Sequence, residues 1–100
     1  MQRIPSKIKP LKARSLEPRS VHSEEYKLLA SMLRDARLAA GLTQREIAVR
    51  LNKPPSFAHK VERAERELNV VELMDYCAAL DVDFLTFTQD VYREIQGLPK

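Results

Sequence analysis

The stretch that decides the fold is residues 44–65, QREIAVRLNKPPSFAHKVERAE. Its spacing is typical of two short helices that cross closely and are joined by a tight turn. Counting from the first glutamine, the small residue Ala48 stands fifth, where the helices must approach, and Asn52 stands ninth, where the turn needs a positive φ. Ala58 and Val61 stand fifteenth and eighteenth, where the second helix points into the core. We therefore predict a helix-turn-helix unit over about residues 44–65.

The boundaries of these two helices follow from local signals. Thr43 and Glu46 have the spacing of a capping box, so the first helix is expected over about residues 44–51. Pro55 suits the first position of a helix, because its missing N–H has no intrahelical partner there. The second helix is therefore expected to run from about Pro55 to Arg63.

Three more helices are predicted outside this unit. One begins after Ser23 and ends at Gly41, with an inward face made of Tyr26, Leu29, Ala30, Leu33, Arg37 and Ala40. A second opens at Asn69 and continues to about Leu80, with a face made of Val70, Leu73, Met74, Cys77 and Leu80. The last opens at Asp83 and continues to about Gln96, with Phe84, Phe87, Val91 and Ile95 facing inward. Because no stretch alternates with period two, we predict an all-α fold of five helices, in a domain spanning residues 23–97.

Composition narrows the possible functions. The 100 residues favour one domain, and 44% hydrophobic with 31% charged residues is typical of a soluble globular protein. The longest apolar run has five residues, and the N-terminus lacks the apolar core of a secretory signal, so we expect a cytoplasmic protein without a membrane span. The single cysteine fits a reducing compartment. Since no metal-ligand spacing, catalytic triad or phosphate loop is present, we expect no metal, cofactor or enzyme activity.

The positive charge is concentrated at the N-terminus. Residues 1–20 hold six basic residues and one acid, whereas residues 21–100 hold 11 basic and 13 acidic residues. With Pro5, Pro10 and Pro18, residues 1–22 are predicted to be a flexible basic arm. Such an arm either acts as a solubilising tail or binds nucleic acid by displacing counterions from phosphate.

Four segments carry a resemblance to a known family: Leu33–Arg37, Gly41–Ala48, Val61–Arg63 and Cys77–Asp83. Together they resemble the Cro/XRE-type helix-turn-helix family, the fold of phage repressors. The resemblance implies a five-helix, sequence-specific DNA-binding transcriptional regulator that inserts its third helix, about residues 55–63, into the major groove. It also implies an ion pair between Arg37 and Glu62. The implied DNA contacts are Gln44, Lys53, Ser56, Phe57, His59, Lys60, Arg63 and Arg66.

Two departures from the family pattern bear on these expectations. Pro55 stands where a related subgroup has a glutamine that can read adenine, and Ala64 stands where glycine is usual. The expected partners are double-stranded DNA and a second copy, paired through the last helix. An antitoxin that holds a toxin through its N-terminal arm is the alternative function. A domain that no longer reads DNA is a third hypothesis, suggested by Pro55.

Overall fold

The computed structural model describes residues 23–99, and the predicted arm over residues 1–22 lies outside them. The described residues form five α-helices and no strand, which confirms the all-α prediction. Their bounds are α1 Glu24–Ala39, α2 Gln44–Arg50, α3 Phe57–Glu62, α4 Val70–Ala79 and α5 Phe84–Gln96. In this part of the chain, none of the helices combines the length and apolar character that a bilayer crossing requires.

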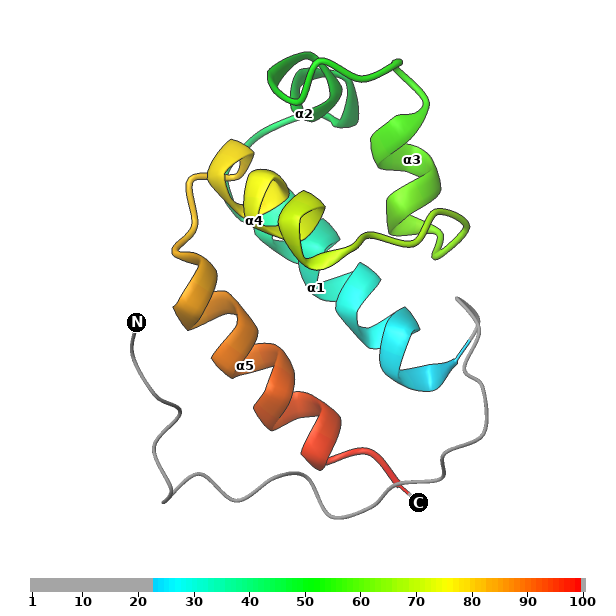
Figure 1. Ribbon diagram of the computed structural model, residues 1–100, viewed down its shortest axis with the longest axis vertical. Coiled ribbons are helices and arrows are strands. Elements are labelled where there is room, and N and C mark those ends of the chain that lie inside the picture. The colour runs from blue at the N-terminus through cyan, green and yellow to red at the C-terminus, as the bar shows by residue number, and fades with distance from the viewer. Residues whose placement is uncertain (1–22, 100) are drawn as a thin grey trace.

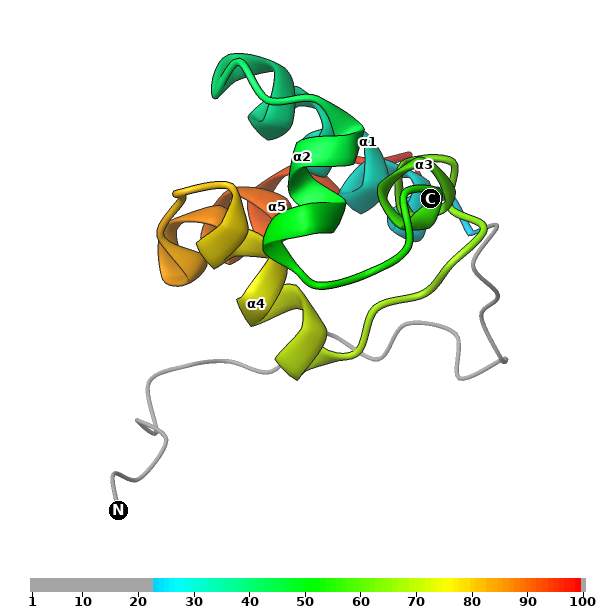
Figure 2. The same cartoon turned by 90° about the horizontal axis from the view of Figure 1, so that it is seen from above.

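Helix α1 occupies the middle of the domain, with α3 on one side and α5 on the other (Figure 1). Helices α2 and α3 pack against each other as the helix-turn-helix unit, and α4 contacts both α2 and α5. Figure 2, seen from above, shows α2 next to α4, in agreement with the contacts between them. The core between the helices is built from Leu33, Ile47, Ala58, Val61, Leu68, Tyr76, Cys77, Ala79, Leu80, Phe87 and Val91.

Side-chain caps open four of the five helices. The side chains of Ser23, Thr43, Asn69 and Asp83 each accept a hydrogen bond from a backbone N–H in the first turn of the helix that follows. Helix α3 has no such cap, and its first residue is Phe57 rather than Pro55. The predicted start at Pro55 is wrong because the Phe57 N–H donates to the Pro54 carbonyl at 2.9 Å, which closes a tight turn before the helix begins.

Residues with positive φ make the turns between helices. Asn52 has φ of 55°, as the turn of the helix-turn-helix unit requires. Ala64 has φ of 59°, two residues after α3 ends at Glu62, so α3 does not extend to this position. This conformation costs alanine about 1 kcal/mol relative to glycine, but its methyl group is buried, with 3% of the residue exposed.

The inward face of α4 differs from the predicted one. Val70 and Met74 are exposed at 67% and 48%, whereas Tyr76 is fully buried. The helix therefore turns its Tyr76 and Cys77 side into the core. In α1 the predicted face is correct except at its end, where Ala40 is exposed beyond the last helical residue.

Removing the Tyr76 hydroxyl should stabilise the fold. This buried oxygen has no hydrogen-bond partner among the described residues, and burial raises the pKa of the phenol. Because an unpaired buried hydroxyl carries a desolvation cost, we expect Tyr76→Phe to raise the free energy of unfolding by about 1 kcal/mol in urea denaturation. A fall of that size would mean that the hydroxyl is hydrogen-bonded in solution.

Candidate nucleic-acid interface

A buried ion pair fixes α3 to α1. The Arg37 Nε and Nη2 atoms donate to the two carboxylate oxygens of Glu62 at 2.6 and 3.0 Å, and 10% and 3% of the two side chains are exposed. The remaining Arg37 Nη1 donates to the Leu42 carbonyl at 2.9 Å. The structure therefore contains the Arg37–Glu62 pair that the family resemblance implied. The hydrogen bonds that the guanidinium donates to Glu62 raise its pKa.

Gln44 connects this pair to the surface. Its Nε2 donates to the Glu62 Oε1 at 2.9 Å, although the residue stands at the start of α2. The side-chain amide is half-buried and has a second N–H. One carboxylate therefore holds the last residue of α3, the first residue of α2 and an arginine of α1 together.

Helix α3 separates its core contacts from an exposed polar face. Ala58 and Val61 are completely buried, while Ser56, His59 and Lys60 are exposed. Among residues 23–99, neither His59 nor Lys60 has a side-chain hydrogen bond or an ion pair. Their side chains thus remain available to a ligand on this face.

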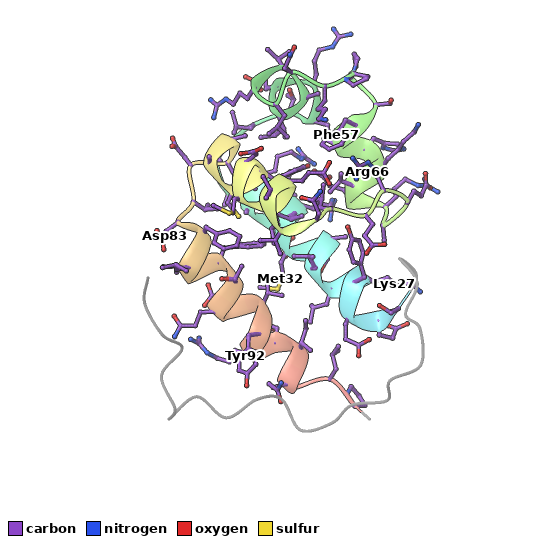
Figure 3. All side chains as sticks on the ribbon, in the orientation of Figure 1. Lys27, Met32, Phe57, Arg66, Asp83 and Tyr92 are labelled. Atoms are coloured by element: carbon purple, nitrogen blue, oxygen red, sulfur yellow. The ribbon has the colours of Figure 1, made fainter. Side chains whose placement is uncertain are left out.

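Two cations lie over the ring of Phe57 at the edge of this face. The Lys53 Nζ and the Arg66 guanidinium carbon both lie 5.5 Å from the centre of its ring. The ring also packs against Tyr76, with the ring centres 6.3 Å apart. Figure 3 places Phe57 and Arg66 close together beside α3. The Phe57 ring, which the resemblance implied as a DNA contact, therefore also takes part in packing within the domain.

Arg66 is held by several contacts within the domain. Its Nη2 donates to the Glu72 Oε2 at 2.6 Å, and its Nη1 donates to the Glu72 Oε1 at 3.2 Å and to the Glu67 carbonyl. Tyr26 holds the same loop, because its hydroxyl donates to the Arg66 carbonyl and accepts from the Leu68 N–H. Arg63 is more exposed and pairs with Glu65 at 2.7 Å.

Sequence reasoning passed over Arg45 as a surface cation near the interface. It is exposed and lines a shallow hollow with Thr43, Gln44 and Arg34, at the junction of α1 and α2. The signal was present, since Arg45 directly follows Gln44 and residues 43–66 hold six basic residues against three acidic ones. This cation extends the positive surface from α3 toward the start of α2.

The described residues that could bind a metal are scattered, and their cysteine is buried. Across residues 23–99, no three metal-binding side chains come together. Cys77 is fully buried, and burial raises the pKa of its thiol to about 11, so the reactive thiolate is scarce at neutral pH. The arrangement that remains is an exposed polar helix beside exposed cations.

Comparison with known proteins places the fold. A family model described as helix-turn-helix matches residues 33–87, which is more than half of the chain. The chain is similar to an XRE-family like protein from Pseudomonas syringae pv. tomato str. DC3000, with a TM-score of 0.69 and 40% sequence identity over 74% of this chain and 90% of that chain. No curated protein matches.

Two further similar structures are of one restriction-modification controller protein, C.Esp1396I. A point mutant of it has a TM-score of 0.69 and 25% identity, over 77% of this chain and 98% of that chain. The same controller protein has been solved as a tetramer in complex with its natural 35 base-pair operator, with a TM-score of 0.68 and 24% identity, over 75% of this chain and 99% of that chain. At that identity the second likeness shows the fold alone.

Removing one partner of the buried Arg37–Glu62 ion pair should destabilise the domain more than removing both partners. Arg37→Met leaves the Glu62 carboxylate buried and unpaired, so we expect a loss of about 3–5 kcal/mol in the free energy of unfolding. Adding Glu62→Met should recover much of this loss, as measured by urea denaturation of the single and double variants. As a control, Lys27→Met breaks an exposed pair with Glu24 and should cost less than about 1 kcal/mol. Equal losses in the single and double variants would contradict this prediction.

The ion pair between Arg66, in the loop after α3, and Glu72 of α4 should make the stability of the domain sensitive to acid. The hydrogen bond from Arg66, and then that from the Asn69 N–H, lower the pKa of the Glu72 carboxyl below 4.5. A lowered pKa in the folded state adds stability above the unfolded-state pKa, and this stability is lost as the pH falls through the folded-state value. Between pH 7 and pH 3, Glu72→Gln should therefore lose less stability than the unmodified chain. Parallel pH profiles of the unfolding free energy would rule out this contribution.

Proposed function

Because the chain belongs to the Cro/XRE-type helix-turn-helix family, we propose that it is a sequence-specific DNA-binding transcriptional regulator that inserts α3 into the major groove. The observation that carries the proposal is the division of α3 into two buried residues and an exposed polar face that includes His59 and Lys60. The operator complex of C.Esp1396I supports DNA as the partner class for this fold.

The exposed side chains receive roles according to their chemistry. Ser56, His59 and Lys60 are the candidates for base contacts, since they are exposed around the start and middle of α3. Lys53 and Arg63 stand at either end of the helix, where phosphates would lie. We assign Arg45 to the same phosphate-binding role. Gln44 would donate its second amide N–H to a phosphate while the first stays on Glu62.

The remaining two candidates, Phe57 and Arg66, act mainly as supports in this proposal. Arg66 is engaged with Glu72 and lies over the Phe57 ring, so a DNA contact would compete with these interactions. Phe57 keeps Lys53 beside α3 through the cation–π contact. Pro55 lies in the turn before α3 and is exposed, where it can contribute shape but no side-chain hydrogen bond.

We also propose that two copies bind DNA together through the last helix. One six-residue helix contacts few base pairs, and pairing doubles the contacts over half-sites about one helical turn apart. Leu85 and Tyr92 of α5 are exposed at 73% and 51%, which supports a partner on this helix. The antitoxin alternative stays a prediction, since the segment that would hold the toxin lies outside the described residues.

Selection of a binding site from random duplexes would supply the cognate DNA, and two variants then test the roles. Lys60→Ala should relax preference at one base pair by about 1–3 kcal/mol, whereas Gln44→Ala should weaken binding to cognate and scrambled duplexes alike. Both are measured by titration at one salt concentration, with thermal unfolding to confirm the fold. Arg93→Ala removes the same charge from α5 and should leave the cognate preference unchanged. Equal losses on both duplexes for Lys60→Ala would reduce Lys60 to a phosphate contact, and failure to select any site would contradict sequence-specific binding.

Analytical ultracentrifugation tests the pairing. At saturation we expect two chains on each duplex that carries the selected site, and Leu85→Ser with Tyr92→Ser should weaken this pairing. Val70→Ser with Met74→Ser removes exposed apolar surface from α4 and serves as the matched control. One chain for each duplex over a palindromic site would overturn the proposal.

A further inference from the structure

A groove with an apolar floor lies between α1 and the start of α5, away from the proposed DNA-binding face. Its volume is about 460 Å³, and Met32, Ala36, Val82 and Phe87 form the floor. Three carboxylates, those of Asp35, Asp83 and Asp90, stand among the lining residues, and no basic residue does. In Figure 3, Met32 of α1 points toward α5, and Asp83 marks the start of α5. The groove thus combines apolar surface with negative charge.

The three carboxylates are poorly neutralised by the described part of the chain. Among the described residues, Asp35 has no ion pair. Asp90 forms an ion pair with Arg93 at 3.6 Å, but more than half of the Arg93 side chain is exposed. Such exposed pairs contribute little. Asp83 caps α5, and the hydrogen bond from the Thr86 N–H lowers the pKa of its carboxyl, so it is ionised at neutral pH. A cationic ligand would therefore find unsatisfied negative charge along the groove.

The chain itself contains a segment of the complementary composition. Residues 7–16, KIKPLKARSL, carry four basic residues and no acid, interspersed with Ile8, Leu11 and Leu16. By contrast, residues 21–100 carry 11 basic and 13 acidic residues, so the basic excess of the chain lies in its first twenty residues. Basic side chains match the carboxylates, and aliphatic side chains match the floor.

The linker length permits this contact within one chain. Met32 follows Ser23 by nine residues, which places it about 14 Å along α1 at 1.5 Å per residue. Leu16 lies seven positions before Ser23, and seven extended Cα–Cα steps can span up to about 24 Å. We propose that residues 7–16 bind in the groove between α1 and α5 of their own chain, with the basic side chains on Asp35, Asp83 and Asp90.

One consequence rests on the proposed DNA binding. Helix α1 separates the groove from α3, so a segment bound in the groove is held on the side of the domain away from the proposed DNA surface (Figure 1). Its cations then add nothing to phosphate contacts while they are bound. The contact itself can be tested without DNA, so its failure is distinguishable from failure of the proposed function.

Paramagnetic broadening in the full chain tests the contact. A nitroxide attached at Ser15→Cys labels the segment without changing its charge, and the buried Cys77 thiol is protected under native conditions. We expect the backbone amide signals of Ala36, Val82 and Phe87 to lose at least twice as much intensity as that of His59 on α3. Raising the salt concentration to about 0.5 M should reduce this difference, because salt screens the exposed charges.

Two charge variants decide whether the groove carboxylates are responsible. Asp35→Asn with Asp90→Asn should abolish the selective broadening, whereas Glu67→Gln with Asp75→Asn removes two acids outside the groove and should preserve it. Amide spectra of both double variants check the fold. Uniform broadening, or selective broadening that survives the groove variant, would overturn the proposal. A mixed sample distinguishes a contact between copies, with the nitroxide on unlabelled chains and the isotope label on chains without nitroxide. Selective broadening in that sample would assign the contact to a second copy and would also overturn the proposal.

Discussion

The Glu62 carboxylate is the group on which the arrangement of the helix-turn-helix unit depends. It accepts from an arginine of α1 and from Gln44 at the start of α2, while it belongs to the last turn of α3. A six-residue helix is too short to be stable by its own hydrogen bonds, so its orientation must come from tertiary contacts. The ion pair fixes the orientation of α3, while Ala58 and Val61 are buried in the core and hold the helix against it.

A second set of contacts holds the other side of α3. Arg66 joins the loop to Glu72 of α4, and Tyr26 of α1 joins the same loop through its hydroxyl. Phe57 packs against Tyr76 and lies beneath two cations. The exposed face of α3 is therefore presented by a short helix whose two flanks are attached to α1 and α4. This rigidity suits recognition that depends on the placement of a few side chains.

Much of this architecture was predictable because local signals and the core pattern agree. Thr43 and Glu46 mark the start of α2, and Asn52 marks the turn. Arg37 lies on an otherwise apolar face because it pairs with Glu62. The predicted start of α3 is too early because proline is favoured both in the first turn of a helix and in a turn that precedes one. Pro55 alone does not distinguish the two. The face of α4 was misjudged because a run of apolar residues allows more than one face to turn inward, and only packing selects Tyr76 over Met74.

Other features depend on contacts that a sequence does not display. Nothing in the order of residues shows that Arg66 pairs with Glu72, or that two cations lie over the Phe57 ring. Likewise, Asp35 and Asp90 line the same groove although more than fifty sequence positions separate them. Such pairings arise from the packing of α1 against α5, which the helix pattern alone leaves undetermined.

The division of α3 into buried and exposed residues has a consequence for how this protein can evolve. Ala58, Val61 and Glu62 are committed to the fold, while His59 and Lys60 contact no other described side chain through a hydrogen bond or ion pair. Substitutions at the exposed positions should therefore leave stability nearly unchanged. Duplicated copies of such a gene could acquire new binding preferences at these positions without first passing through unfolded intermediates.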